Sequence, residues 1–288
     1  MEFSHIPVLL QPCLDGLNID PAGIYLDGTA GGAGHSREIA KRLTTGRLIS
    51  LDQDPDAVAV ATERLKGLPA QVVQVNFREA ARVLAELGIP AVYGALLDLG
   101  VSSHQLDDAA RGFSYHADAP LDMRMSQQGP TAADLVNTLD REELTRILRD
   151  YGEEPYAWQI AGKIVAARAE QPILTTLQLA ESVAAAVPPA ERRKAKNPAR
   201  RTFQAIRIAV NSELDALNEG RDAIFDCLSP GGRLCVITFH SLEDRLVKNK
   251  FRVAKAKLIP RKPIAAAAAE LETNRRSRSA KLRVLEKA

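Results

Sequence analysis

The chain has 288 residues, 45% of them hydrophobic and 26% charged, which is the composition of a globular enzyme with a sizeable core. No apolar run approaches the roughly 18 residues that span a bilayer, and the N-terminus lacks a secretory signal, so we expect a cytoplasmic protein without a membrane anchor. The three cysteines are scattered and the histidines form no cluster, which argues against disulfides and against a metal site.

Strand and helix patterns alternate through the first hundred residues. Apolar or β-branched strands are predicted at 23–28, 46–54, 70–77 and 93–100, and helices at 36–44, 55–67 and 78–88. Such alternation is typical of a Rossmann-like α/β fold with a doubly wound parallel sheet. Ligands of these sheets bind at the carboxyl ends of the strands, so we expect the site at that edge.

The next convincing strand, at 232–240, follows a segment far longer than one crossover needs. Apolar residues at helical spacing predict a helix at 141–152, and a Thr175/Gln178 capping box predicts another at 175–187. We therefore predict a core formed by two segments and an inserted helical domain for substrate recognition. The predicted boundaries are 1–106 and 212–288 for the core, and 107–211 for the insert.

Several connecting segments have weaker patterns. Residues 102–130 are polar and are predicted to form a long loop, which is usually functional or mobile. After the insert, we expect a crossover helix at 211–229 and a tight turn at 229–234. Near the C-terminus, closing strands are predicted at 256–262 and 280–287, with a loop at 265–269.

Basic residues are concentrated although the net charge is only +2. Residues 191–207 contain seven Lys or Arg against one Glu, and residues 275–283 contain five against none. Solvated helix faces and a flexible tail would explain either run alone. Two such runs in one chain favour a polyanionic partner.

The segment IYLDGTAGGAGHS, residues 24–36, places an aspartate and a glycine cluster after the first predicted strand. The glycines do not have the G-x-G-x-x-G spacing of a dinucleotide-binding turn. Asp27 followed by a bare backbone suits a ligand with an amino-acid group and no phosphates. Asp52 and Asp54 end the next strand, where a carboxylate accepts hydrogen bonds from ribose. Tight packing of the turn is the structural alternative.

At this point the sequence resembles the class I S-adenosylmethionine-dependent methyltransferases, and within them the family of bacterial ribosomal RNA small-subunit methyltransferase H. The resemblance covers almost the whole chain in nine ordered blocks. One departure is Ala33, where the family usually has glycine, and we expect a poorer fit to positive φ there without loss of binding. The blocks are HIPVLL (5–10), DGTAGGAGHS (27–36), LDQDP (51–55), LLDLGVSSHQLDDAARGFSY (96–115), PLDMRM (120–125), YGEE (151–154), RTFQAIRIAVNSEL (201–214), PGGRL (230–234) and FHSLEDR (239–245).

The family implies S-adenosyl-L-methionine as the cofactor and N4-methylation of a cytosine in the decoding region of 16S ribosomal RNA, with the 30S subunit as the expected partner. It also implies that Asp52 contacts the ribose and that Phe77 lies beside the adenine. A buried core Phe and a plain loop Gln are the alternatives for Phe77 and Gln105. The cofactor-binding residues implied are Gly31, Ala33, Gly34, His35, Asp52, Phe77, Asp98 and Gln105.

Asp98 ends the fourth predicted strand, where amino-methyltransferases hold the target amine toward the methyl group. No cysteine lies at 96–105, which argues against methylation of a ring carbon. His240 is the second catalytic candidate, because it ends the fifth strand, where its ring could contact the base or accept a proton. A helix cap by Asp98, and a structural role of His240 with Glu243 and Arg245, are the alternatives.

The insert is predicted to dock the RNA, because arginines contact the backbone and aromatic rings stack on bases. Three other functions stay open: an NAD-dependent oxidoreductase, a non-catalytic RNA-binding protein, and a methyltransferase for another RNA or a protein amine. The residues predicted to bind RNA are Arg192, Arg193, Arg200, Arg201, Arg207, Phe113 and Tyr115.

Overall fold

The computed structural model describes residues 6–194, 197–251 and 256–288. Residue 5 of the first motif block and residues 195–196 of the basic run lie outside the described residues. The chain divides into two compact units, a core unit of Met1–Gly100 with Leu214–Ala288 and a helical unit of Val101–Glu213. The predicted insert, 107–211, is shorter than the helical unit at both ends.

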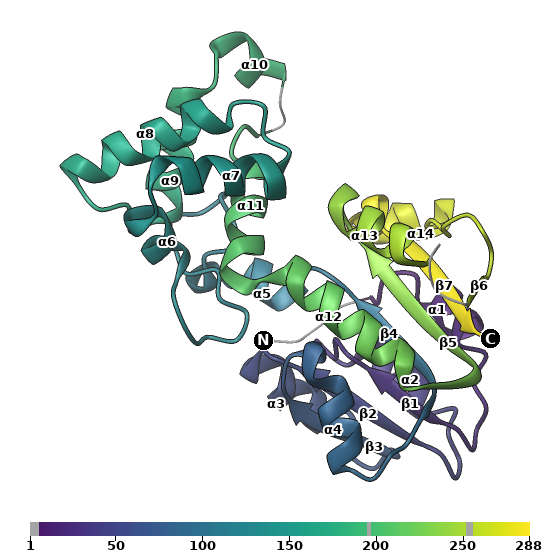
Figure 1. Cartoon of the computed structure of the whole chain (residues 1–288). Coiled ribbons are helices and arrows are strands. Elements are labelled where there is room, and N and C mark those ends of the chain that lie inside the picture. The colour runs from purple at the N-terminus through teal and green to yellow at the C-terminus, as the bar shows by residue number, and fades with distance from the viewer. Residues whose placement is uncertain (1–5, 195–196, 252–255) are drawn as a thin grey trace. The chain divides into compact units, whose positions relative to one another are not determined.

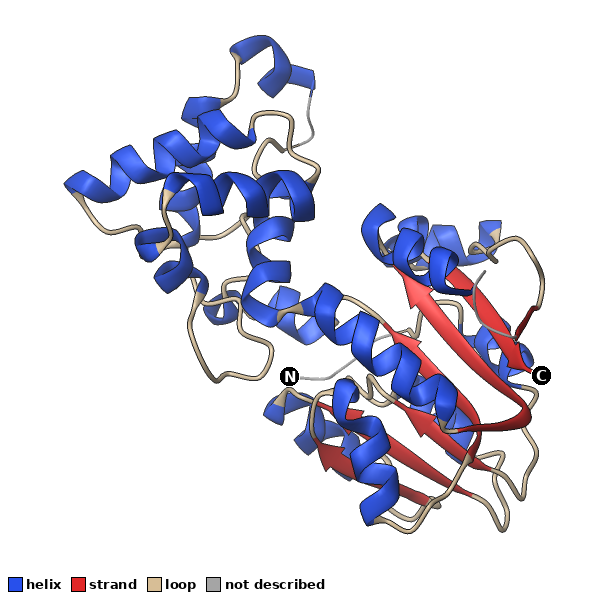
Figure 2. Ribbon diagram, viewed as in Figure 1, coloured by secondary structure: helices blue, strands red, loops and turns tan. Residues whose placement is uncertain are grey.

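The described part of the core unit contains one seven-stranded sheet with the order β3-β2-β1-β4-β5-β7-β6 (Figure 2). Strands β1 to β5 are parallel to one another, and β7 runs antiparallel to β5 and β6. This is the Rossmann-like parallel sheet that the sequence predicts, with β7 added in the antiparallel direction. The strands are β1 (Ile24–Asp27), β2 (Arg47–Asp52), β3 (Ala70–Gln74), β4 (Val92–Asp98), β5 (Leu228–Thr238), β6 (Ala256–Leu258) and β7 (Lys281–Lys287).

Helices cover both faces of this sheet, and Figure 1 shows α12 and α4 in front of it. Alternate residues of a strand face opposite sides, so Leu48 packs into one apolar cluster and Ile49 into the other. Helices α1, α2 and α3 contribute to the first cluster, and α4, α12 and α13 to the second. The helices are α1 (Leu10–Leu17), α2 (Gly34–Ala40), α3 (Pro55–Arg64), η1 (Phe77–Glu79), α4 (Ala80–Glu86), α12 (Glu213–Asp226), α13 (Ser241–Phe251), α14 (Ala268–Thr273) and η3 (Arg275–Ser279).

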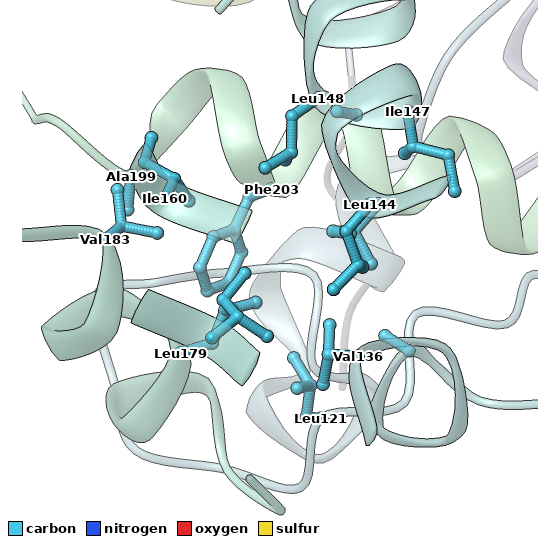
Figure 3. Packing of buried hydrophobic residues seen from close by; sticks show 14 of the residues in the cluster. Leu121, Val136, Leu144, Ile147, Leu148, Ile160, Leu179, Val183, Ala199 and Phe203 are labelled. Carbon is cyan, nitrogen blue, oxygen red and sulfur yellow. The ribbon is translucent and has the colours of Figure 1, made fainter. Parts of the chain in front are cut away.

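The helical unit encloses its own apolar core, part of which is shown in Figure 3. Leu144 and Leu148 of α7 meet Phe203 of α11 in this core, as their helical spacing requires. The predicted helix at 141–152 and the Thr175/Gln178 capping box are both present. The helices are α5 (Ser103–Asp107), η2 (Ala109–Arg111), α6 (Ala132–Thr138), α7 (Arg141–Gly152), α8 (Ala157–Glu170), α9 (Thr176–Ala186), α10 (Pro189–Lys194) and α11 (Arg200–Asn211).

Three local predictions are corrected by the structure. The segment 229–234 is not a turn before the strand, because β5 already begins at Leu228 and bulges opposite β4 before pairing resumes at Arg233. The loop predicted at 265–269 overlaps α14. The long loop at 102–130 contains α5 and η2, because Ser102 and Asp108 each cap a short helix with a side-chain oxygen.

None of the described helices is long and apolar enough to cross a membrane. Across the same residues, no group of three or more His, Cys, Asp or Glu side chains is arranged to hold a metal ion.

Candidate active site at the carboxyl edge of the sheet

Three predicted acidic residues meet where the strand order reverses between β1 and β4. Asp27, Asp52 and Asp98 are the last residues of β1, β2 and β4, and parallel strands place their carboxyl ends at one edge of the sheet. A reversal of strand order opens a crevice at that edge, which is where α/β sheets of this kind bind ligands.

The glycine-rich turn after β1 is folded back on itself and tied to the neighbouring strands. The Ala33 N–H donates to the Ala30 carbonyl at 2.7 Å, and the Ala30 N–H donates to the Leu51 carbonyl at 2.8 Å. A side chain at position 34 would collide with Pro7, since a Cβ there would lie 2.5 Å from the proline ring. Hydrogen bonds therefore hold the turn in place, and close packing against Pro7 excludes a side chain at Gly34. The backbone of the turn at this position is not covered by a side chain of its own.

Ala33 departs from the family pattern at a position that the structure shows to be strained. Its φ is 60°, in the left-handed region that favours glycine, and its methyl group is buried. Gly31 adopts a φ of 50° in the same turn. Ala33 therefore adopts the positive φ that we expected to suit alanine poorly. The turn nevertheless forms its hydrogen bonds.

Asp52 accepts two backbone hydrogen bonds. Its Oδ2 accepts from Gly31 N–H at 2.8 Å and its Oδ1 from Asp54 N–H at 2.9 Å. Burial outweighs these bonds and raises the pKa of Asp52 to about 6. Asp54 does not pair with it at the ligand edge, because the Asp54 carboxylate caps α3 by accepting from Asp56 N–H.

Asp27 is fully buried, so it shapes the site and does not contact a ligand directly. It accepts hydrogen bonds from the Ser36 hydroxyl at 2.6 Å and from Thr29 N–H at 3.0 Å. Thr29 in turn accepts from Asp98 N–H at 2.6 Å, which ties the turn to the end of β4. Burial raises the pKa of Asp27. Sequence reasoning missed Thr29, whose only signal is its place two residues after a strand-ending aspartate.

Asp98 is the most isolated of the three carboxyl groups. Its Oδ2 lies 3.6 Å from Nδ1 of His35, and its buried Oδ1 has no hydrogen-bond donor among the described residues. Burial, followed by the negative charges of Asp27 and Glu243, raises the pKa of Asp98 well above its usual range.

The edge is thus a cluster of acidic groups without a matching cation. No described lysine or arginine forms an ion pair with Asp27 or Asp98. Such a cluster favours a positively charged ligand, and S-adenosylmethionine carries a sulfonium and an ammonium group beside a ribose. The unpartnered Asp98 oxygen, the bare turn and the Asp52 carboxylate therefore fit this cofactor.

His240 lies at the start of α13, where its contacts fit the structural alternative given above, and its catalytic role stays a prediction. The His240 carbonyl accepts from Asp244 N–H, and its Nδ1 accepts from Glu243 N–H at 3.4 Å. Glu243 Oε2 accepts from the N–H groups of Phe239 and His240, and its Oε1 lies 3.1 Å from His240 Nε2. Both ring nitrogens thus lie near Glu243, and Nδ1 accepts a hydrogen bond, but Nε2 is buried without a hydrogen-bond partner among the described residues. A Glu three residues after the cap was the available signal.

Phe77 and Gln105 are the remaining predicted cofactor residues. The Phe77 side chain is half-buried and fills the space beside Gly28 and Gly220. This packing is compatible with a role in the core and with a position beside the adenine. Gln105 belongs to the helical unit, where its Oε1 accepts from Ser102 N–H at 2.9 Å and completes the capping box of α5. Its local role is therefore structural.

The predicted RNA-binding residues of the helical unit fall into two groups. Arg192 and Arg193 of α10 and Arg200 and Arg201 of α11 have exposed side chains. Arg207, by contrast, forms a two-pronged ion pair with Glu213 at 2.7 and 2.9 Å.

The two aromatic predictions are changed by packing. Phe113 is buried in the apolar core of the helical unit, so its ring has no free face for a base, and this corrects its predicted stacking role. Tyr115 is half-buried and packs edge-on against Phe203 with a centroid distance of 5.4 Å.

The fold and the acidic edge of the sheet are those of a class I methyltransferase. The chain belongs to the MraW methylase family, which it matches over residues 2–288. It is 54% identical over 310 aligned positions to the ribosomal RNA small subunit methyltransferase H of Lachnospira eligens, covering 100% of this chain and 98% of that protein. It is 51% identical to the protein of the same name from Symbiobacterium thermophilum, covering 100% and 98%.

Among solved structures, an rRNA methylase from Streptococcus thermophilus aligns with a TM-score of 0.47 and 12% identity, covering 99% of each chain. Membership of a methylase family removes the NAD-dependent oxidoreductase from the functions left open by the sequence.

Proposed function

We propose that this protein uses S-adenosyl-L-methionine to methylate the exocyclic amino nitrogen of a cytosine in the decoding region of 16S ribosomal RNA. The observation that carries the proposal is full-length membership of the methylase family together with an acidic, uncompensated crevice where β1 and β4 end. The reaction belongs to the cytoplasm, where ribosomal RNA is matured, and its substrate is RNA within the 30S subunit.

The chemistry asks the protein mainly to position and desolvate its substrate. The bound cofactor supplies an electrophilic methyl group. The exocyclic amine of cytosine is conjugated with the ring and is a poor nucleophile, so in-line alignment and exclusion of water carry the rate. Asp98 is the residue we assign to the amine, because its Oδ1 is an acceptor with no donor among the described residues.

A covalent route through cysteine does not fit this chain. Methylation of a pyrimidine ring carbon needs an activated thiolate. Burial raises the pKa of all three thiols, that of Cys235 to about 12, and Cys13 and Cys235 are buried among apolar residues. Attack by the amine nitrogen itself is therefore the reaction that these side chains support.

The helical unit is the part that we assign to RNA docking. Exposed Arg192, Arg193, Arg200 and Arg201 offer guanidinium groups to phosphates, and Tyr115 remains the aromatic candidate for stacking. A methyltransferase acting on another RNA or on a protein amine is the alternative, and the basic surface argues against the protein substrate.

The test is transfer of labelled methyl from S-adenosylmethionine to purified 30S subunits and to free 16S RNA, followed by nucleoside mass spectrometry. Wild type is expected to label an N4-methylated cytidine, and Asp98→Ala to lower the rate by about 100-fold or more, because the amine loses its acceptor. Exposed Asp118→Ala in the helical unit serves as the control. Label found only in protein, or cofactor binding without any transfer, would contradict the proposal.

A further inference from the structure

The hydrogen bonds of His35 determine which of its ring nitrogens carries the proton. Nε2 lies 3.0 Å from the carbonyl oxygen of Val8, and a carbonyl can only accept, so Nε2 is the N–H donor. Burial lowers the pKa of His35 to about 4, so the ring is neutral at pH 7. A neutral ring with its proton on Nε2 has a lone pair on Nδ1.

Asp98 is the acidic residue beside that nitrogen. Nδ1 of His35 lies 3.6 Å from Asp98 Oδ2, which is too long for a hydrogen bond. An ionised carboxylate at this place would set two acceptors against each other, whereas a neutral acid removes that repulsion. The other oxygen, Oδ1, is buried without a donor, which is costly for a carboxylate and much less so for a neutral acid.

The described groups that act on Asp98 are two carboxyl groups, a thiol and an imidazole, and one of the carboxyl groups, Glu243, is itself paired with His240 at 3.1 Å. Asp27 approaches from β1, Glu243 from α13 and the buried Cys13 thiol from α1, while His35 of α2 is neutral. Both carboxylates disfavour a further negative charge, and no described lysine or arginine balances it.

We propose that Asp98 holds a proton in the cofactor-free protein and releases it to solvent when S-adenosylmethionine binds. The O–H bond of the carboxyl group breaks, the proton passes to water, and the carboxylate that remains balances the positive charge brought into the crevice. The inference rests on the proposed function for the identity of the cofactor. It adds to that function a protonation state for Asp98.

The same charge balance indicates what Asp98 does afterwards. The methylated amine must lose one proton, and S-adenosylhomocysteine lacks the sulfonium charge. A carboxylate that has already given up its proton can accept the one from the amine, and the crevice then returns to its starting charge. In this proposal Asp98 is therefore the proton acceptor.

The experiment is isothermal titration calorimetry of the full-length protein with the cofactor alone, in buffers of different ionisation enthalpy, at pH 6 and pH 7.5. We expect wild type to release about one proton per S-adenosylmethionine and close to none per S-adenosylhomocysteine. Below the pH at which Asp98 ionises, affinity falls by up to about tenfold per pH unit. At pH 7.5 Asp52 is already ionised and does not contribute.

Two variants separate Asp98 from its acidic neighbours. Asp98→Asn keeps the shape of the neutral acid and is expected to bind the cofactor without releasing the proton. Asp54→Asn is the matched control, because it removes a buried carboxylate near the site whose role as a helix cap asparagine can take over. It is expected to release the same number of protons as wild type.

Equal proton release by wild type and Asp98→Asn, or no release by wild type, would overturn the inference while leaving the proposed function intact. Failure of wild type to bind the cofactor at all would instead overturn the proposed function. Carbon-13 NMR of the carboxyl groups in wild type gives an answer even if the variant does not fold. A carboxylate signal for Asp98 at pH 6 in the cofactor-free protein would contradict the proposal.

Discussion

The two units of the molecule carry acidic and basic groups at their proposed binding surfaces and hold these groups in different surroundings. In the core unit, Asp27 and Asp98 are held in a crevice without a described cation beside them. In the helical unit, the arginines at positions 192, 193, 200 and 201 are exposed to water. Burial raises the pKa of both carboxyl groups and so disfavours their charged forms, whereas an exposed guanidinium group stays charged at almost no cost.

The difference indicates how each unit would match its proposed ligand. Under the proposals above, a cation that enters the core unit replaces the proton of Asp98, which would give specificity for charge at a fixed point. The helical unit leaves its charges solvated, which suits a polyanion whose binding releases counterions. The predictions below test whether these two designs are separable.

The largest effect is expected from Phe203→Ala. The ring is buried in the core of the helical unit, so its removal should lower the free energy of unfolding by about 3–5 kcal/mol. Urea denaturation followed by fluorescence of Trp158, the single tryptophan, reports on this unit. Cofactor affinity should be unchanged, since the acidic residues lie in the core unit. A matched Phe225→Ala in α12 is the control, and loss of cofactor binding in Phe203→Ala would show that the two designs are not separable.

The next effect is a pH dependence specific to the core unit. The pKa of His35 is lowered to about 4, so the stability contributed by the neutral ring is present above pH 6.5 and is lost as the pH falls toward 4. The pKa of Asp52 is raised to about 6, so its contribution is present below about pH 4 and is lost as the pH rises through 6. The two contributions oppose each other in wild type.

His35→Gln keeps a donor for the Val8 carbonyl and removes the first contribution only. Relative to wild type, its free energy of unfolding should therefore fall by about 2 kcal/mol more between pH 4 and pH 7, because the raised pKa values of Asp52, Asp27 and Asp98 act in both proteins and only the opposing contribution of His35 is lost. Urea denaturation across this range measures the difference. His116→Gln, at an exposed site in the helical unit, should behave as wild type. A variant profile that matches wild type would contradict the opposing signs.

Charge reversal at Arg200 and Arg201 is expected to have a smaller, salt-dependent effect on the helical unit alone. The double change to Glu should weaken binding of 16S RNA by about 10- to 100-fold at low salt, because phosphate contacts become repulsive. Cofactor affinity should not change. Filter binding over a salt series measures this, with reversal of the exposed pair Arg261 and Lys262 in the core unit as the matched control. Equal losses of RNA affinity in both variants would contradict the assignment of RNA docking to the helical unit.

The smallest effect is expected from Ala33→Gly in the turn after β1. Glycine relieves the left-handed φ of 60° but loses a buried methyl group and gains flexibility when unfolded. These terms nearly cancel, so the stability should change by less than about 1 kcal/mol, as measured by thermal denaturation. A change of more than about 2 kcal/mol in either direction would show that the alanine has a role that its backbone conformation does not explain.

The sequence by itself determined the elements whose pattern is local. Strand ends place Asp27, Asp52 and Asp98 at one edge because parallel strands share their direction, whatever packs around them. The helix at 141–152 was predicted with both of its observed boundaries, since its apolar spacing and its cap lie within the segment. The acidic site and the family resemblance were therefore readable before any contact was known.

Only the tertiary structure decided what the neighbouring side chains do. Three side chains that could serve a binding or catalytic site have local partners instead. His240 and Asp54 accept hydrogen bonds from backbone N–H groups at helix starts, and Arg207 forms an ion pair. Phe113 follows a polar loop in sequence and is nevertheless buried in an apolar core. The protonation state that we assign to Asp98 depends on a carbonyl from Val8, a residue distant in sequence, because the protein's fold selects the partner of each polar group.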